Sequence, residues 1–425
     1  NKKQVRELDM IYFLFKIQKK MRFAISIIIL LILEYYSYIA FSSLNRSKTF
    51  TILYFIITFS LYLYIGYKFY NTNFSKGQSH KSMFLMSIVL LIVLPKLILS
   101  VPMLIQDILR VFFGIGKKIA GTETTTFLPE RRKFVSQVAL GIAAIPFLSI
   151  IYGMAKGKYN FKVIKQTIYF DDLPEAFDGF KITQISDIHS GSLDDAEKIQ
   201  YAVDLINEQD SDVFVFTGDL VNSLAEEMNP WISILSKIKK HPFGNYSILG
   251  NHDYGEYVKF DSVQAKQKNF EEIKNSHSKI GWRLLLNENV TFTKDNEIIN
   301  LVGVENWGLK FKKAGDLPLA SEGLNPETFK ILLTHDPSHW EAEVVENPMN
   351  YGLTLSGHTH GMQFGIEIPG YFQWSPVKYV YPQWAGLYQK AKNYIYVNRG
   401  FGFHAFAGRV GINPEITVIE LKKTR

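Results

Sequence analysis

The chain has 425 residues, carries a formal net charge of +7 and contains no cysteine. This length allows roughly one to three domains, and the lack of cysteine excludes disulfide bonds, a thiolate nucleophile and a zinc–cysteine site. The surplus positive charge lies largely at the N-terminus and beside apolar segments, which favours contact with anionic lipid headgroups over nucleic acid. The sequence has no basic stripe with interleaved aromatic residues, so we expect no nucleic-acid partner.

Four long apolar runs fill the first part of the chain. Each is long enough to cross a bilayer, given a rise of about 1.5 Å per residue in a helix. The third run contains Pro95 and Pro102 and ends with charged residues on one face, so we expect a kinked span followed by an interfacial amphipathic turn. Core helices of a soluble protein are the alternative, but four such runs favour membrane spans. The expected transmembrane helices lie at about 23–41, 50–70, 83–113 and 135–153.

The charges beside the fourth run bear on which side of the membrane the rest of the chain lies. Arg131 and Arg132, followed by an aromatic and apolar stretch, resemble a twin-arginine export signal, but they also fit a basic cluster that keeps a helix end in the cytoplasm. Both interpretations place the chain after the fourth span outside. The basic residues within 2–22 oppose them, because four spans put both ends on one side; a natural start at Met21 would remove most of this conflict. We expect an extracytoplasmic C-terminal domain and leave open whether residues 1–20 are native.

From residue 156 onward, apolar strands alternate with helical segments. Strand, helix, strand, helix, strand in the first half predicts a layered α/β core. The strands that follow indicate a second sheet, and therefore a sandwich covered by helices. We divide the chain into a transmembrane domain, residues 1–155, and a second domain, residues 156–425. The expected strands lie near 162–170, 180–185, 213–217, 246–249, 298–304, 330–334, 351–356, 393–398 and 415–420, and the expected helices near 194–207 and 230–239.

Residues able to hold metal ions follow five of these strands. The last group, 357–360 (Gly-His-Thr-His), places two imidazoles on one side, because side chains alternate along an extended chain. Each group alone is a weak signal and could be a turn or a cap. All of them follow the carboxyl ends of strands, where open α/β sheets place their sites. The candidate residues are Asp187, His189, Asp219, Asn251, His252, Asp253, His335, His358 and His360.

This mixture of carboxylate, amide and imidazole groups indicates a two-metal phosphoesterase. Two cations about 3.5–4 Å apart can clamp the attacking and leaving oxygens of a phosphoester. A bridging carboxylate and a bridging hydroxide hold the ions at such a spacing. Mixed Asp, Asn and His ligands suit manganese, iron or zinc, whereas an all-oxygen site would suit magnesium. We therefore expect two divalent ions, manganese in first place, with iron or zinc as alternatives.

The order of the motifs, Asp-x-His, Gly-Asp, Gly-Asn-His-Asp, His and Gly-His-x-His, resembles the calcineurin-like metallophosphoesterase family. The tail around 397–416 further resembles the bacterial membrane-associated branch of that family, and the likeness covers about residues 160–425. It implies the α/β fold class, with a four-helix transmembrane region followed by a four-layer α/β/β/α metallophosphoesterase sandwich. It also implies a multi-pass protein of a bacterial inner membrane. One residue departs from the family pattern, because Met362 stands before Gln363 where the family usually has glycine.

The resemblance also implies a role for each candidate residue. One metal would be held by Asp187, His189 and His360, the other by Asn251, His335 and His358, and Asp219 would bridge both. His252 would stabilise the transition state or protonate the leaving oxygen, oriented by Asp253. The remaining histidines, His80, His241, His277, His339 and His404, are expected to be surface or packing residues.

The expected function is hydrolysis of a phosphodiester or pyrophosphate bond in a lipid-linked or envelope substrate, for example a nucleotide-diphosphate acyl sugar. The aromatic segment 371–384 would form a lid suited to an amphiphile, or simply the face of the domain turned to the membrane. The alternative function is a non-catalytic membrane scaffold or sensor that retains the fold; the complete ligand set argues against it. A transporter is disfavoured because the spans carry few ionisable residues beyond Glu34, Lys96 and Asp107. The sequence leaves the substrate and the oligomeric state open.

Overall fold

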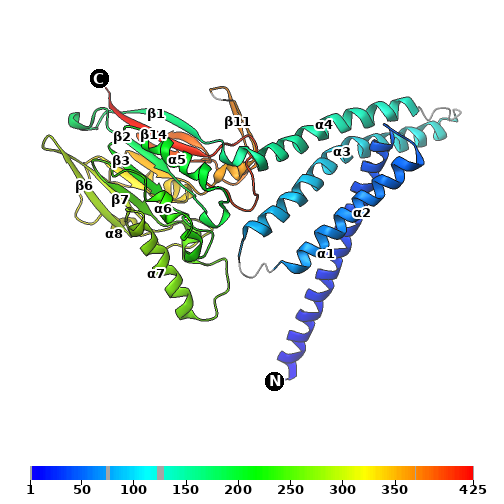
Figure 1. The fold of residues 1–425 in the computed structure, drawn as a ribbon, viewed down its shortest axis with the longest axis horizontal. Coiled ribbons are helices and arrows are strands. Elements are labelled where there is room, and N and C mark those ends of the chain that lie inside the picture. Colours follow the sequence, from blue (N-terminus) through cyan, green and yellow to red (C-terminus); the bar gives the residue numbers. More distant parts are fainter. Residues whose placement is uncertain (1, 73–76, 122–128, 369, 425) are drawn as a thin grey trace. The chain divides into compact units, whose positions relative to one another are not determined.

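The computed structural model describes residues 2–72, 77–121, 129–368 and 370–424. The chain separates into two compact units, one of Asn1–Asn71 with Ile88–Ile151 and the other of Thr72–Ser87 with Tyr152–Arg425. The first unit is helical, and every strand assigned among the described residues belongs to the second (Figure 1). The start of the third long helix therefore belongs to the second unit, although it precedes that unit's main segment in the sequence.

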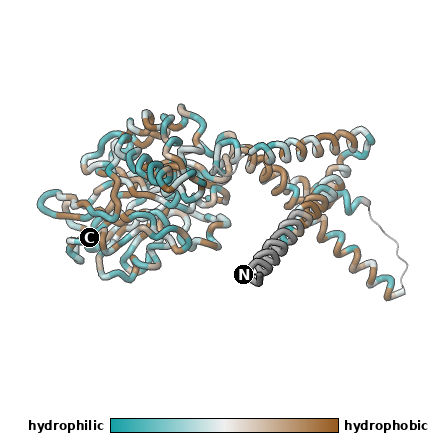
Figure 2. Tube along the Cα trace, turned by 90° about the horizontal axis from the view of Figure 1, so that it is seen from below, coloured by the Kyte–Doolittle hydropathy of each residue, from teal (hydrophilic) through white to brown (hydrophobic). Residues whose placement is uncertain are grey.

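The first unit is built from long helices. Each contains a stretch long and apolar enough to cross a membrane, and Figure 2 shows hydrophobic residues along them. The third helix runs without interruption through Pro95 and Pro102 instead of ending in a separate turn. Proline is tolerated in membrane helices because neighbouring groups satisfy the carbonyls that it frees. The helices are α1 (Lys2–Ser42), α2 (Lys48–Asn71), α3 (His80–Ile119) and α4 (Pro129–Ala155).

A polar cluster joins three helices inside the first unit. The carboxylate of Glu34 on α1 accepts hydrogen bonds from Tyr54 and Tyr62 on α2, at 2.5 and 2.8 Å. Lys96 on α3 contacts the same carboxylate at 2.5 Å. A charged group inside a membrane segment is costly unless it is paired. The cluster therefore compensates a charge that the membrane would otherwise disfavour.

Two six-stranded sheets form the centre of the second unit. The strands of the first sheet are β1 (Lys162–Phe170), β2 (Lys181–Ile185), β3 (Val213–Thr217), β4 (Asn245–Ile248), β5 (Arg283–Leu284) and β14 (Glu415–Lys423). Those of the second sheet are β6 (Glu288–Lys294), β7 (Glu297–Gly303), β8 (Lys330–Leu333), β9 (Leu353–Ser356), β12 (Gly386–Lys390) and β13 (Asn393–Val397). The orders are β1-β14-β2-β3-β4-β5 and β12-β13-β9-β8-β7-β6, and a separate hairpin pairs β10 (Ile366–Ile368) with β11 (Phe372–Trp374).

Most of the pairing within each sheet is parallel. In the first sheet β2, β3, β4 and β5 run in one direction, and in the second sheet β7, β8, β9 and β13 do so. The carboxyl ends of the parallel strands in a sheet consequently meet at one edge. The helices of this unit are α5 (Ala196–Asn207), α6 (Ile232–Leu235), α7 (Val263–Lys279) and α8 (Leu317–Ala320).

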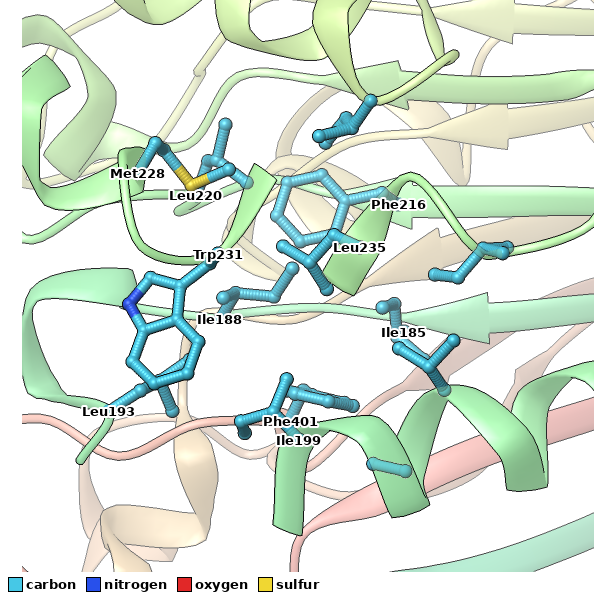
Figure 3. Close-up of a cluster of buried hydrophobic side chains, with 14 of the residues drawn as sticks. Ile185, Ile188, Leu193, Ile199, Phe216, Leu220, Met228, Trp231, Leu235 and Phe401 are labelled. Atoms are coloured by element: carbon cyan, nitrogen blue, oxygen red, sulfur yellow. The ribbon is translucent and has the colours of Figure 1, made fainter. Parts of the chain in front are cut away.

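Alternating side chains place apolar layers on both faces of each sheet. On β3, Val215 faces the core between the sheets and Phe216 faces a core on the outer side. Figure 3 shows this outer core, in which Phe216 and Leu235 from α6 point toward each other. On β8, Leu333 faces the inner core and Leu332 packs on the outer side of the second sheet. Period-two alternation thus explains the layered packing, and the predicted four-layer α/β/β/α sandwich is confirmed.

Three helices differ from the expectation, and the single turn α8 is one that the sequence did not indicate. The segment near 230–239 contains only one helical turn, α6, and continues as hydrogen-bonded turns. The long helix α7 was not predicted, because its sequence is mostly polar. Its buried face has only Ile273 as an apolar residue, beside Ser276 and His277. A helical period is therefore hard to detect from apolar positions alone.

Candidate active site

The candidate residues lie at the carboxyl edges of both sheets, where five strands end. Asp187 and His189 follow β2, Asp219 follows β3, Asn251, His252 and Asp253 follow β4, His335 follows β8, and His358 and His360 follow β9. The backbone N–H of His358 donates to the Asp187 carboxylate at 3.0 Å, which ties the second sheet to the first. The packing of the two sheets therefore brings together residues that are far apart in sequence.

One group of possible ligands consists of Asp187, His189 and His360, whose ligand atoms lie within 4.8 Å of one another. The Nε2 atoms of the two imidazoles are 3.0 Å apart. Nε2 of His360 is also 3.2 Å from Oδ1 of Asp187. All three side chains are buried. Three donor atoms thus converge on one point at the edge of the first sheet.

A second group consists of Asp219, His335 and His358. Nε2 of His335 lies 3.1 Å from Oδ2 of Asp219 and 3.3 Å from Nδ1 of His358. Asn251 joins this group, because its Oδ1 is 2.9 Å from the same His358 nitrogen. The second group therefore contains one carboxylate, one amide oxygen and two imidazoles.

Asp219 stands between the two groups. Its Oδ2 lies 3.5 Å from Nε2 of His189 in the first group and 3.1 Å from Nε2 of His335 in the second. Its Oδ1 accepts a hydrogen bond from the backbone N–H of His252 at 2.8 Å. One carboxylate oxygen is thus within reach of imidazoles from both groups.

The hydrogen bonds around the imidazoles fit metal binding. Nδ1 of His189 is 3.1 Å from Oδ1 of Asn222, and Nδ1 of His335 is 2.7 Å from the carbonyl oxygen of Thr217. In the neutral tautomer, a ring that donates from Nδ1 to an oxygen carries a free lone pair on Nε2. Those Nε2 atoms are the ones that face Asp219. Carboxylate, amide and imidazole donors with this orientation suit a borderline divalent metal, so the residues fit two such ions.

The pKa values of the buried carboxylates and imidazoles in the site depend strongly on one another. Burial by itself would lower the pKa of His335, but the carboxylates of Asp219 and Asp187 raise it to about 10. Burial opposes ionisation of Asp219, yet the imidazoles of His335 and His252 hold the pKa of that carboxyl well below its usual range. The carboxylates are therefore ionised at neutral pH and attract positive charge. A bound cation would replace the proton that they draw onto His335.

The backbone of the site is strained. Positive φ angles of +54°, +47°, +61°, +72° and +51° occur at Asp187, His189, Asp219, His358 and His360. For residues with a Cβ atom, this left-handed conformation costs roughly 1–2 kcal/mol each. Strain of this kind gathers at functional sites, where the surrounding structure holds it in place.

Met362, two positions after His360, also has a strained backbone. Met362, which replaces the glycine usual in the family, has a φ of +54°. Glycine adopts such an angle without steric cost. The chain therefore keeps a glycine-like backbone at Met362 although it has given up the glycine.

The structure changes the expected relation between His252 and Asp253. Nδ1 of His252 is 2.7 Å from the carbonyl oxygen of Asn222, so that carbonyl orients the ring. The Asp253 carboxylate instead accepts hydrogen bonds from four backbone N–H groups, those of Asp219, Leu220, Val221 and Gly250. A carboxylate aligned with backbone donors positions a loop. The expected contact between Asp253 and His252 is not among the hydrogen bonds of the described residues, and the contacts of Asp253 favour a role in stabilising the loop that carries Asp219.

A cavity of about 330 Å³ opens over the two groups. Its wall includes Gln78, from the segment before α3, and His404, from the loop before β14. The Oε1 atom of Gln78 accepts a hydrogen bond from the N–H of Ala405 at 2.9 Å, and its carbonyl accepts one from Nδ2 of Asn222 at 3.4 Å. A segment that precedes a membrane helix in the sequence thus completes the wall of the cavity.

Several residues of the site were not identified from the sequence, among them Asn222, His404, Tyr381 and Gln78. Asn222 lies three positions after Asp219, and proximity to that residue was the available signal. His404 was assigned to packing, but its ring stacks on His189 with 4.6 Å between ring centres. Tyr381 contacts Nε2 of His358 at 2.9 Å. Gln78 carries no motif, and only the fold brings it to the cavity.

A helix-covered double sheet with two linked groups of Asp, Asn and His at its edge defines a metal-dependent phosphoester hydrolase. Two family models match the chain: one described as calcineurin-like phosphoesterase, over residues 180–362, and one described as the probable transmembrane domain of a calcineurin-like phosphoesterase, over residues 21–158. The chain belongs to the calcineurin-like metallophosphoesterase family. It is a multi-pass membrane protein, and the family prediction from the sequence is confirmed.

Curated relatives share both the family and, in part, the membrane character. An uncharacterized metallophosphoesterase, YkuE, of Bacillus subtilis is 32% identical over 279 residues, which cover 64% of this chain and 90% of that protein. A transmembrane protein with metallophosphoesterase domain from Danio rerio is 29% identical, over 64% of this chain and 60% of its own length. UDP-2,3-diacylglucosamine pyrophosphatase LpxG of Chlamydia muridarum is 28% identical, over 54% of this chain and 81% of its own.

Proposed function

We propose that the protein hydrolyses a phosphodiester or pyrophosphate bond of a lipid-linked or envelope substrate, using two divalent metal ions. The observation that carries this proposal is the position of Asp219, whose Oδ2 lies 3.5 Å from His189 in one donor group and 3.1 Å from His335 in the other. A shared carboxylate is what two closely spaced cations require. Manganese is the first candidate for the ions, and iron and zinc follow, because the donor set is mixed.

Each donor group would hold one ion. The first ion would be held by Asp187, His189 and His360, the second by Asn251, His335 and His358, and both by Asp219. Two such ions supply Lewis acidity and activate water for attack on phosphorus. The cavity above the groups is the space for the phosphate ester.

We assign His252 as the general acid that protonates the leaving oxygen. It lines the cavity, and its Nδ1 is held by the Asn222 carbonyl at 2.7 Å. Nε2 is then the ring nitrogen left to exchange a proton with substrate. Asp253 positions the loop that carries Asp219 and has no direct part in proton transfer under this assignment.

The membrane segments and one relative support the proposed substrate class. A protein with four apolar spans meets amphiphiles at the bilayer surface. The relative from Chlamydia muridarum is named as a pyrophosphatase of UDP-2,3-diacylglucosamine, a nucleotide-diphosphate acyl sugar. We propose a phosphate ester of this kind as the substrate of this chain.

The test uses the full chain in detergent, loaded with manganese. Mass spectrometry of UDP-2,3-diacylglucosamine before and after incubation detects cleavage of the pyrophosphate, and a chromogenic phosphodiester reports the chemistry without a lipid. Cleavage that stops on chelation and returns with added manganese is expected. Binding of the metal ions without turnover of either compound would favour the alternative function, a membrane scaffold or sensor that retains the fold.

We further propose a bacterial inner membrane as the location, an extracytoplasmic active site, and a division into membrane and catalytic domains between residues 155 and 156. The chain has no cysteine, so single cysteines give a clean test of sidedness. Ser278 on α7 and Ala120 after α3 are exposed positions in the two units. In intact cells, an impermeant thiol reagent should label Ser278→Cys and leave Ala120→Cys unlabelled. The reverse pattern would place the active site in the cytoplasm.

A further inference from the structure

The β10–β11 hairpin has its apolar face turned outward. Ile366 and Ile368 alternate with Glu367 on β10, and Phe372 pairs with Ile368 across the hairpin. Ile366, Ile368 and Phe372 are each more than half exposed. On the other face, Glu367 contacts Nη2 of Arg399 at 2.5 Å, and Gln373 donates to a backbone carbonyl. The polar face is thus directed to the body of the domain, which is the reverse of the usual arrangement for a strand in water.

Neighbouring residues extend this exposed face. Tyr371 at the turn of the hairpin is 91% exposed, and Figure 1 shows the hairpin standing out from the sheets. Exposed apolar side chains concentrated in one short stretch of chain, 362–380, fit an interaction site. We call the set the apolar surface; it consists of Met362, Ile366, Ile368, Tyr371, Phe372, Tyr379 and Val380.

The base of the hairpin is linked to the end of a membrane helix within the same unit. Gly365, just before β10, donates its N–H to the carbonyl of Val410 at 2.9 Å. The adjacent Arg409 donates its N–H to the carbonyl of Gly153 at 3.2 Å. Gly153 lies in the last turn of α4, one of the four candidate spans. Two short hydrogen-bonded steps therefore connect the apolar surface to the point where the chain leaves the membrane segment.

We propose that the apolar surface docks on the lipid bilayer in which the protein is anchored. Tyrosine and phenylalanine side chains suit the boundary between headgroups and acyl chains. Lys378, which is exposed next to Tyr379, suits anionic headgroups. Exposure of these seven large apolar side chains to water is unfavourable in free energy, and contact with lipid removes this cost.

Docking would bring the active site to the membrane surface. Met362 follows His360 by two positions, and Tyr381, next to Val380, contacts Nε2 of His358 at 2.9 Å. The apolar surface and two of the metal-ligand candidates, His358 and His360, therefore belong to one continuous stretch of chain. This inference goes beyond the proposed function, because docking on lipid does not depend on which ester is cleaved.

The test is lipid quenching of a single fluorescent label. Tyr371→Cys carries an environment-sensitive dye, and the full chain is placed in nanodiscs of phosphatidylcholine and phosphatidylglycerol in equal parts, with or without brominated acyl chains. Nanodiscs expose both faces, so the result does not depend on sidedness. Ser278→Cys, also exposed and in the same unit, is the matched control. Gln373→Cys lies on the opposite face of the hairpin and tests which of the two faces contacts lipid.

Docking predicts quenching by brominated lipid at residue 371 that is at least about twice that at residue 278, with a blue-shifted emission. Quenching at residue 373 should be weaker than at residue 371. Equal, low quenching at 371 and 278 would overturn the proposal. A blue shift that occurs only with two chains per disc, without lipid quenching, would also overturn it and assign the surface to a second copy. An unchanged circular dichroism spectrum and unfolding temperature of the labelled protein show that the fold is intact.

A paired variant gives an independent measurement. Ile368→Ser combined with Phe372→Ser removes apolar groups from the face but leaves the Glu367–Arg399 contact. In this background the label at residue 371 should lose most of its lipid quenching. Retention of full quenching would mean that contact with lipid arises from another part of the chain and would overturn the role of the hairpin.

Discussion

Asp219 and His335 face each other across the two sheets, with Oδ2 of the carboxylate 3.1 Å from Nε2 of the imidazole. Asp219 follows β3 of the first sheet and His335 follows β8 of the second. The contact is made within the buried edge where both sheets end. If this pair binds metal as proposed, ligation would depend on the packing of the sandwich, and a change that shifts one sheet against the other would disturb the site.

Asp219→Asn should reduce the content of both metal ions and lower turnover of a chromogenic phosphodiester by more than about a hundredfold. The amide is neutral and removes the charge shared by both donor groups, whereas changes outside the ligand shell already cost about 10–100-fold. Metal analysis and steady-state rates measure the two effects. Asp204→Asn, at an exposed position on α5, is the control. Normal metal content and rate in Asp219→Asn would contradict the two-metal assignment.

His252→Ala should retain both metal ions while turnover falls by roughly a hundredfold or more, the range for a lost general acid. The ring bonds to the Asn222 carbonyl, and Asn251 supplies the amide oxygen beside His358. Metal analysis of the purified variant separates ligation from catalysis. Loss of one metal equivalent would make His252 a ligand instead of an acid.

Tyr381→Phe should weaken metal binding by about tenfold to a hundredfold, the range for partners of metal-binding histidines. The Tyr381 hydroxyl donates to Asp336 at 3.2 Å, so it accepts the Nε2–H of His358 at 2.9 Å. That arrangement leaves the lone pair of His358 on Nδ1, beside Asn251. Titration of the metal-free protein with manganese measures the affinity. Tyr379→Phe, on the exposed surface nearby, should bind manganese normally.

Gln78→Ala should raise the KM for substrate with little change in metal content. Gln78 lines the cavity and is held by Ala405 and Asn222. The loss of one hydrogen bond of about 1 kcal/mol corresponds to about a fivefold change in KM. Gln267→Ala on the exposed face of α7 is the matched control. A KM equal to that of the control would show that the Gln78 side chain does not contribute to binding.

His277 makes the stability of the catalytic unit sensitive to acid. Burial lowers the pKa of His277 from 6.5 to about 3, and Nδ1 is 2.9 Å from Oγ of Ser247. Below about pH 6.5, His277 binds a proton in the unfolded chain but stays neutral in the native protein. Stability is therefore complete above about pH 6.5 and falls as the pH drops toward 3, by about 1.4 kcal/mol per unit.

A variant isolates this effect. The free energy of unfolding of the parent should fall between about pH 7.5 and about pH 5.5. In His277→Gln this fall should be smaller by about 1.4 kcal/mol. Denaturant unfolding in detergent at both pH values measures it, and His277→Asn provides a second non-titrating side chain. An identical pH dependence in the parent and both variants would mean that the pKa of His277 in the native protein is close to its value in the unfolded chain.

Local sequence patterns indicated most of the elements, although not α7, and supplied the list of ligand candidates. Apolar runs of bilayer length indicated the four spans, because a helix in lipid needs an unbroken apolar surface. Apolar strands such as 213–217 were recognisable because they are buried on both faces. The polar residues that follow the strands were visible for the same reason, since each interrupts an apolar run. Asp187, Asp219 and His335 belong to this class.

Only the tertiary structure decided how those residues are used. The Asp253 carboxylate could have bonded to the adjacent His252, but four backbone N–H groups of the folded loop satisfy it instead. Gln78 carries no motif and reaches the cavity because the start of α3 packs in the catalytic unit. The outward direction of Ile366 likewise depends on the hairpin, whose polar face is held by Arg399. Each of these outcomes depends on contacts between residues distant in sequence, which local periodicity does not encode.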